Sequence, residues 1–82
     1  MKSYTTYILY SEKRKRYYVG RTTNEVEDRL RRHNTNHKGY TGKTGDWEIK
    51  YIKRYWTKRE SIKAERKIKK RGAKRFLEDQ KE

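Results

Sequence analysis

The chain has 82 residues, and its 25 Lys and Arg against 11 Asp and Glu give a formal net charge of +14. Such a charge indicates a polyanionic partner, and this length allows one domain at most, which we expect over residues 1–82. The absence of cysteine excludes disulfides and thiolate zinc sites. No apolar run is long enough to span a membrane and no signal peptide opens the chain. We therefore expect a cytoplasmic protein that binds nucleic acid and not a membrane.

Aliphatic residues are scarce, which leaves open a basic peptide that is disordered until it binds. The eight tyrosines and two tryptophans argue against that alternative, because disordered chains are poor in aromatic residues. Each aromatic ring also buries a large apolar area. We therefore expect a small, tyrosine-rich core of modest stability.

The first two elements are predicted to form a hairpin. Residues Tyr4–Ser11 alternate as a strand does, a charged turn follows at 12–15, and Arg16–Arg21 forms a second short strand. A helix comes next, because Asn24 with Glu27 makes a capping-box pattern.

This helix is expected to end near Asn34. Three glycines among Asn, Thr and Lys residues then predict a mobile loop as far as Asp46. The longest strand candidate follows at Trp47–Trp56, with large side chains at alternate positions. These side chains are Trp47, Ile49, Tyr51 and Tyr55.

A second capping-box pattern, Thr57 with Glu60, starts a helix that is expected to reach Arg71, with Gly72 just beyond its last turn. A short helical turn is expected at Arg75–Asp79. The order strand, strand, helix, strand, helix, helix predicts an α/β fold with a small three-stranded sheet, antiparallel or mixed, flanked by helices.

Glu65 is the most conspicuous charge on the second helix. On a helical wheel it lies between Ile62 and Ile68, on the side that is expected to face the core. A carboxylate in such a place needs a cation or a metal ion. Two interpretations remain open from the residues alone: an ion pair with Lys69, one turn on, or a Mg²⁺ ligand at a phosphate site.

Arg29 and His33 are four residues apart on the first helix and therefore project together. The structural alternatives are an ion pair between Arg29 and Glu25 and a capped or buried histidine at the helix end. The functional interpretation is a phosphodiester site, where the guanidinium stabilises phosphoryl charge and the neutral imidazole accepts a proton.

Tyr7 and Tyr18 are expected on neighbouring strands, on the same face of the hairpin. Simple core packing or cross-strand stacking explains both tyrosines as well as a catalytic role does. A tyrosine acts as a general base only if nearby cations lower its pKa from about 10. Arg29 and His33 are the candidates for that effect.

In this order and at these distances, the motifs together resemble a known nuclease family. Tyr7-Ile8-Leu9 with Tyr18-Val19-Gly20 resembles the paired strands that name the GIY-YIG family, and 24–34, with Arg29, resembles its first helix. Ala64-Glu65 is similar to the helix that carries the family's metal-binding glutamate.

The resemblance extends over roughly residues 4–77. Tyr40-Thr41 followed by Trp47 is similar to the loop and third strand of short stand-alone bacterial members. The same resemblance extends to the nuclease domains of excision-repair incision subunits and homing endonucleases. It implies a GIY-YIG-like fold and an endonuclease that hydrolyses DNA phosphodiester bonds with one divalent ion, Mg²⁺ or Mn²⁺.

The resemblance also implies a role for each site residue. Tyr7 activates the attacking water, and His33 helps to remove its proton. Tyr18 hydrogen-bonds near the scissile phosphate, and Arg29 stabilises the charged transition state. Glu65 holds the metal ion that stabilises the leaving oxygen. The base differs among members, so either tyrosine remains a candidate.

The chain departs from the family pattern at three places. Thr5 and Thr6 stand where the first motif has glycine and isoleucine. The stretch from Tyr18 to Arg29 is one residue longer than usual. Phe76-Leu77 occupies the region where larger members carry an asparagine.

Weaker signals concern the basic surface. The histidines His33 and His37 are a poor metal pair, because the helix is expected to end between them. The glycine-rich loop lacks the surroundings of a nucleotide phosphate loop. The basic run 63–75 is better explained as a solvated helix face than as a surface that follows the phosphate backbone. The residues expected to contact nucleic acid outside the catalytic set are Arg21, Lys38, Tyr40, Lys43 and Lys69.

Three functional hypotheses follow. The first is a metal-dependent DNA endonuclease with little sequence specificity, acting on branched, flapped or damaged DNA in repair or recombination, with RNA as a further possible partner. The second is a non-catalytic nucleic-acid-binding module on the same fold. The third is the basic peptide that is disordered until bound. We expect a monomer or a weak dimer.

Overall fold

The computed structural model describes residues 3–23, 25–34 and 45–80. Within them, three strands form one antiparallel sheet in the order β2-β1-β3: β1 (Tyr4–Ser11), β2 (Arg16–Thr22) and β3 (Trp47–Tyr55). The helices are α1 (Val26–Asn34), α2 (Lys58–Arg71) and α3 (Ala73–Asp79). The predicted α/β class and the order of elements are confirmed, and the sheet is antiparallel throughout.

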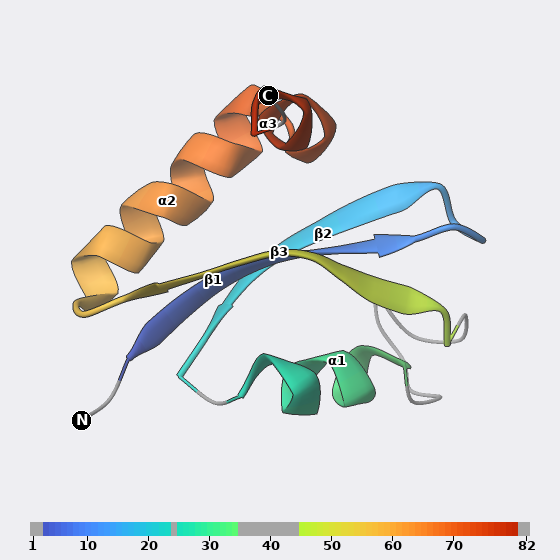
Figure 1. The fold of residues 1–82 in the computed structure, drawn as a ribbon, viewed down its shortest axis with the longest axis horizontal. Coiled ribbons are helices and arrows are strands. Elements are labelled where there is room, and N and C mark those ends of the chain that lie inside the picture. The colour runs from blue at the N-terminus through green and yellow to red at the C-terminus, as the bar shows by residue number, and fades with distance from the viewer. Residues whose placement is uncertain (1–2, 24, 35–44, 81–82) are drawn as a thin grey trace.

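The sheet lies between two layers of helices, with α1 on one face and α2 and α3 on the other (Figure 1). Successive side chains of a strand point to opposite faces, so the central strand β1 supplies both cores. The buried hydrophobic residues are Tyr7, Leu9, Val26 and Trp47 on the α1 side, and Ile8, Ile68 and Phe76 on the α2 side.

A register shift in β3 moves its side chains from one face to the other. Leu9 pairs with Ile49 and the adjacent Ile8 with Tyr51, so Lys50 is the extra residue of a bulge. Simple alternation would place Trp47, Ile49, Tyr51 and Tyr55 on one face, and that expectation is wrong. Trp47 and Ile49 pack on the α1 side, whereas Tyr51 packs on the α2 side.

The ends of α2 follow the predicted signals. The Thr57 hydroxyl accepts from the backbone N–H of Glu60 at 3.2 Å and donates to the Glu60 carboxylate at 2.9 Å. Gly72 ends the helix at φ +93°, a backbone conformation that favours glycine, and its N–H donates to the Ile68 carbonyl at 2.8 Å. The predicted cap Asn24 lies outside the described residues. None of the helices described is long and apolar enough to cross a membrane.

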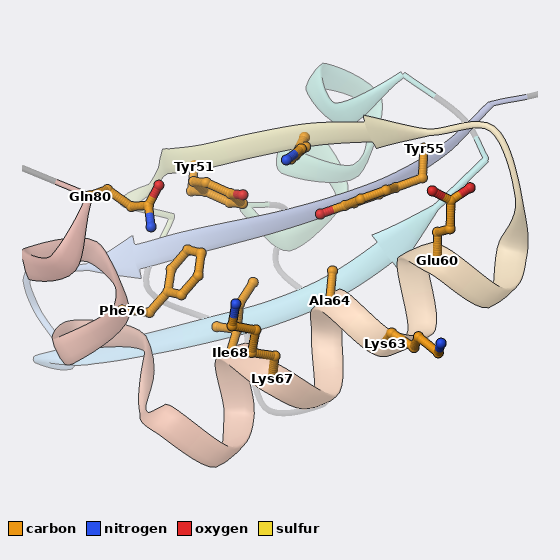
Figure 2. Close-up of a pocket in the computed structure, with 10 residues that line it drawn as sticks. Tyr51, Tyr55, Glu60, Lys63, Ala64, Lys67, Ile68, Phe76 and Gln80 are labelled. Atoms are coloured by element: carbon orange, nitrogen blue, oxygen red, sulfur yellow. The ribbon is translucent and has the colours of Figure 1, made fainter.

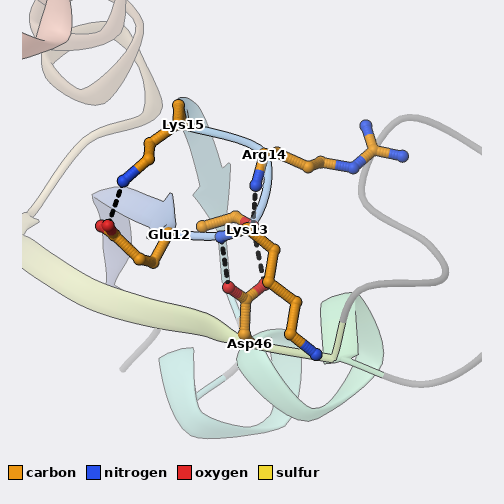
Figure 3. Close-up of polar contacts among 6 residues, drawn as sticks. Glu12, Lys13, Arg14, Lys15 and Asp46 are labelled. Carbon is orange, nitrogen blue, oxygen red and sulfur yellow. Dashed lines mark hydrogen bonds and ion pairs between the residues drawn. The ribbon is translucent and has the colours of Figure 1, made fainter.

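Asp46 ties the β1–β2 turn to the start of β3 (Figure 3). Its carboxylate accepts from the Ser11 hydroxyl at 2.6 Å and from the backbone N–H of Lys13 at 2.8 Å. The Ser11 oxygen in turn accepts from the backbone N–H of Arg14 at 3.2 Å. An ion pair between Glu12 and Lys15 closes the other side of the turn.

Replacing Asp46 with alanine is expected to lower the free energy of unfolding by about 1–3 kcal/mol. The change removes two acceptors and leaves the buried Ser11 hydroxyl and the turn amide to find new partners. Urea unfolding at neutral pH measures the loss. Asp46→Asn keeps one acceptor oxygen and is expected to lose less. Equal stability of Asp46→Ala and wild type would show that the turn holds without this carboxylate.

Candidate active site

Tyr7 and Gly20 are cross-strand partners on the α1 side of the sheet. The Tyr7 ring, which is fully buried, lies directly over the glycine. A β-carbon added at Gly20 would stand 2.7 Å from the Tyr7 hydroxyl oxygen and 2.9 Å from the Tyr18 ring. The glycine of the second strand motif is therefore required by the space that the two tyrosine rings occupy.

The two tyrosines lie on one face, as their spacing predicted. The ring centroids of Tyr7 and Tyr18 are 6.2 Å apart, and those of Tyr18 and Trp47 are 6.5 Å apart in a T-shaped contact with an interplanar angle of 76°. Both rings pack in the α1-side core, so the structural interpretation holds for them. Only Tyr18 is partly exposed, and the two hydroxyls therefore differ in their access to solvent.

Arg29 extends from α1 to the buried tyrosine. Its guanidinium donates a hydrogen bond to the Tyr7 hydroxyl, while its Nε is buried and has no hydrogen-bond partner among the described residues. The alternative of an ion pair with Glu25 is not borne out among the residues described. The Glu25 carboxylate lies 3.7 Å from Arg54, and only its backbone carbonyl accepts from the Arg29 amide.

The environment of Tyr7 favours its neutral form. Burial raises the pKa of the Tyr7 hydroxyl above its ordinary value. The hydrogen bond and positive charge of Arg29 lower that pKa, but they do not offset burial together with the nearby Tyr18 and Glu65. Arg29, a candidate for lowering the Tyr7 pKa, therefore acts in that direction, but the net shift of the Tyr7 pKa is upward.

Glu65 lies on α2 with its carboxylate between two cations. Oε1 is 2.6 Å from Arg21 Nε on β2, and Oε2 is 3.1 Å from Lys69 Nζ one turn along the helix. The Lys69 ion pair weighed from the sequence is confirmed, whereas the Arg21 partner, 44 residues away, is not visible in the sequence. Arg21 and Lys69, both expected to contact nucleic acid, neutralise this carboxylate in the protein alone.

The pKa of Glu65 is set by opposing effects. Burial raises the pKa, since 16% of the side chain is exposed, but the hydrogen bonds from Arg21 and Lys69 outweigh burial. The net result is a Glu65 pKa below its ordinary value, so the carboxylate is ionised at neutral pH.

This lowered pKa predicts a specific acid sensitivity. The ion pairs of Glu65 stabilise the fold above the unfolded-state pKa of about 4.3, and the contribution is lost as the pH falls through the lower folded-state pKa. Wild type is therefore expected to exceed Glu65→Gln in free energy of unfolding at neutral pH, and the gap is expected to close in acid. Urea unfolding of both proteins across pH measures it. A gap that does not change with pH would contradict the assignment.

An open cleft of about 410 Å³ lies where β2, α1 and α2 approach one another. Three cationic side chains, Arg21, Arg29 and Lys58, line it together with hydroxyl groups. The remaining lining residues are Tyr4, Thr22, Thr23 and Ser61. A cleft with this lining suits a phosphate group, because several charge-assisted donors converge on it.

The position of α2 brings the unforeseen residues into this cleft. The Thr6 hydroxyl donates to the Ser61 backbone carbonyl at 3.0 Å, which anchors the first turn of α2 to β1. Lys58, in the same turn, then lines the cleft together with Arg29. Nothing local to Lys58 in the sequence signals this role, since it is one of many exposed lysines.

Several predicted residues remain outside the structural description. His33 falls in the last turn of α1, but its side chain is not among those described. Lys38, Tyr40 and Lys43 all lie outside the described residues, as does His37. The structure thus brings together Tyr7, Tyr18, Arg29, Arg21, Glu65 and Lys69.

A comparison with protein families decides the classification. The model of the GIY-YIG catalytic domain matches residues 3–78 of this chain. The chain belongs to the GIY-YIG family. The antiparallel sheet and the order of helices agree with this fold, and the family implies nuclease activity with DNA as the substrate. No curated protein and no solved structure gives a significant match.

GIY-YIG nucleases generally use a divalent metal ion, and Glu65 fits as one ligand of such an ion. Mg²⁺ at phosphate sites often takes only one or two carboxylates and fills its other positions with water and phosphate oxygens. An ionised carboxylate offers about four lone-pair sites, of which Arg21 and Lys69 engage one on each oxygen. Within the described part of the chain, no cluster of three or more potential metal ligands occurs.

Proposed function

We propose that this GIY-YIG protein is a metal-dependent endonuclease that hydrolyses DNA phosphodiester bonds by attack of water and selects its substrate by structure. One observation carries the proposal: Arg29, which is hydrogen-bonded to Tyr7, and Arg21, which is ion-paired with Glu65, line the same cationic cleft. Packing alone does not require a half-buried arginine whose Nε lacks a partner among the described residues.

Arg29 is proposed to stabilise the charge on the phosphoryl oxygens. A planar guanidinium suits this task because it offers several donors in a fixed geometry. Its hydrogen bond to Tyr7 fixes the side chain before substrate binds, which limits the reorganisation needed in the transition state. Lys58 and Arg21 line the same cleft and add positive charge around the phosphate.

The two tyrosines are proposed to divide the remaining work. Tyr18 is partly exposed, and we assign it the contact with the attacking water and the phosphate, with His33 accepting the proton. Tyr7 is fully buried and its pKa is raised, so we assign it the positioning of Arg29. Glu65 is proposed to hold the divalent ion, which supplies positive charge beside the leaving oxygen when bound.

Selection by structure is supported by what the described elements are. Apart from Asp79, the last residue of α3, all of them fall within the residues 3–78 matched by the catalytic-domain model. Reading a base sequence requires side chains that reach base edges in a groove, usually from an added helix or ribbon. No such added element occurs in the described part of the chain. Branched or flapped DNA is therefore the proposed substrate, in repair or recombination.

The test is cleavage of a labelled panel of single-stranded, duplex, flapped and branched DNA, plus RNA, with Mg²⁺ or Mn²⁺ and with chelator. Wild type is expected to give metal-dependent products, and Glu65→Gln is expected to give none while it still binds DNA. Glu12→Gln is the matched control, because it removes the same charge from an exposed carboxylate in the β1–β2 turn. Binding without cleavage by wild type would overturn the proposal in favour of a non-catalytic binding module.

A further inference from the structure

A second depression lies on the α2 side of the sheet, between β3, α2 and α3. Figure 2 shows Tyr51 and Tyr55 extending from β3 toward α2, with Phe76 from α3 at one end. We call this depression the tyrosine groove. Its volume is about 370 Å³, within the range of small-ligand sites. The residues that line it include Tyr51, Tyr55 and Phe76 and the lysines Lys53, Lys63 and Lys67.

The floor of the tyrosine groove is aromatic and held in place. Tyr51 packs edge-on against Phe76, with ring centroids 5.0 Å apart and an interplanar angle of 88°. Tyr51 also hydrogen-bonds to the side chain of Tyr55, so the two rings on β3 are linked. Ile68 is buried behind them, whereas both tyrosines are only partly buried. Two ring faces are therefore available in a fixed arrangement.

The rim of the groove is cationic. Lys53, Lys63 and Lys67 are exposed, and among the described residues none of them forms an ion pair. Lys53 places its Nζ 5.6 Å from the centre of the Tyr55 ring. The acidic lining residue, Glu60, is engaged by Thr57 at the start of α2. Aromatic faces bordered by unpaired lysines match the two parts of a nucleotide, its base and its phosphate.

The groove lies next to the candidate active site. Tyr55 is the cross-strand partner of Tyr4, which lines the cationic cleft. On α2, Ser61 lines the cleft while its neighbour Glu60 lines the groove. The cleft and the groove therefore lie on opposite sides of the first turns of α2, and a nucleic-acid chain bound in the cleft has the groove within immediate reach.

From these observations we propose that the tyrosine groove binds an unpaired nucleotide of the substrate, with the base stacked on Tyr55 and Tyr51 and the phosphate held by the lysines of the rim. This inference rests on the proposed function and narrows its substrate class to DNA with a single-stranded segment beside the cut. A paired base cannot enter, because its faces are covered by its neighbours in the duplex.

Binding to a fluorescent single-stranded oligonucleotide and to a duplex of equal length, both in chelator, tests this proposal without any cleavage. Tyr55→Ala is expected to weaken single-strand binding about tenfold or more and to leave duplex binding within about twofold. Tyr55→Phe keeps the ring and is expected to bind as wild type does. Circular dichroism establishes that each variant is folded. Equal effects of Tyr55→Ala on both ligands, or no effect, would overturn the proposal.

A charge-matched pair of double variants tests the rim. Lys63→Gln/Lys67→Gln and Lys13→Gln/Lys74→Gln lose the same net charge, so a non-specific contribution falls equally in both. Only the groove variant is expected to lose single-strand preference. Equal losses would overturn the assignment of the lysines. Sedimentation completes the test: self-association that Tyr55→Ala abolishes, with unchanged oligonucleotide binding, would assign the groove to a second copy of the chain instead.

Nucleotide binding in the tyrosine groove and endonuclease activity are tested by separate outcomes. In the cleavage panel, Tyr55→Ala is expected to cut duplex at the wild-type rate and flapped DNA more slowly. If wild type cuts nothing yet binds single strands through Tyr55, the result supports nucleotide binding in the groove and contradicts the endonuclease function. If wild type cuts and Tyr55→Ala shows the same flap preference, the result supports the endonuclease function and contradicts nucleotide binding in the groove. An RNA arm in the same assays shows whether the groove distinguishes the sugar.

Discussion

Replacing Arg29 with alanine is expected to lower the rate of DNA cleavage at least about 100-fold while DNA binding changes less than about threefold. The guanidinium is fixed by its hydrogen bond to Tyr7 and lines the cleft proposed for the phosphate. Its main contribution therefore belongs to the transition state, in which charge builds up on the phosphoryl oxygens. One of 25 basic residues contributes little to overall attraction for DNA.

Single-turnover cleavage with enzyme in excess measures this effect, with DNA affinity determined separately. Arg29→Lys keeps the charge but loses the planar donor geometry, and it is expected to recover only a small part of the rate. Thermal unfolding of each variant controls for damage to the fold. Arg29→Ala with a wild-type cleavage rate would contradict the assignment, and a parallel loss of binding and rate would assign Arg29 to substrate binding instead.

Replacing Trp47 with alanine is expected to lower the free energy of unfolding by about 3–5 kcal/mol, which leaves most of a domain this small unfolded. The Trp47 side chain is 2% exposed and meets Tyr18 edge-on in the α1-side core. Its backbone is also anchored, because the Asn34 side chain accepts from its N–H at 2.7 Å and donates to its carbonyl at 3.1 Å. The large cavity would therefore open where α1 joins β3.

Urea unfolding followed by circular dichroism measures this loss. The chain provides a matched control, since Trp56 is 73% exposed and the same change there is expected to cost less than about 0.5 kcal/mol. Trp47→Phe refills part of the space and is expected to fall between wild type and Trp47→Ala. A Trp47→Ala protein as stable as Trp56→Ala would show that the α1-side core does not depend on this ring.

The two tyrosines of the candidate active site are also part of the core. Tyr7 and Tyr18 fill space between β1, β2 and α1, and Gly20 is required by their rings. The structural and catalytic interpretations weighed for the tyrosines are therefore compatible, because one ring can pack on its faces and act through its hydroxyl. A substitution such as Tyr7→Phe, which keeps the ring, is the informative one here.

The sequence by itself determined the elements and their order, because the signals for them are local. Alternation marked the strands, and the Thr57 capping box and Gly72 marked the ends of α2 within one residue. The candidate site, with Tyr7, Tyr18, Arg29 and Glu65, came from the resemblance of the ordered motifs to the GIY-YIG family, because each residue taken singly has an equally good structural explanation. The ion pair of Glu65 with Lys69 is of the same local kind.

Only the tertiary structure decided which face and which partner each residue has. The bulge at Lys50 sends Tyr51 to the α2 side, since a one-residue shift reverses the direction of every later side chain. Arg21 reaches Glu65 and Lys58 reaches the cleft because α2 packs across the sheet, and these contacts join residues far apart in the chain. Alternation and capping act over a few residues and carry no information about such distances, so the cationic cleft and the tyrosine groove emerge only when the layers are assembled.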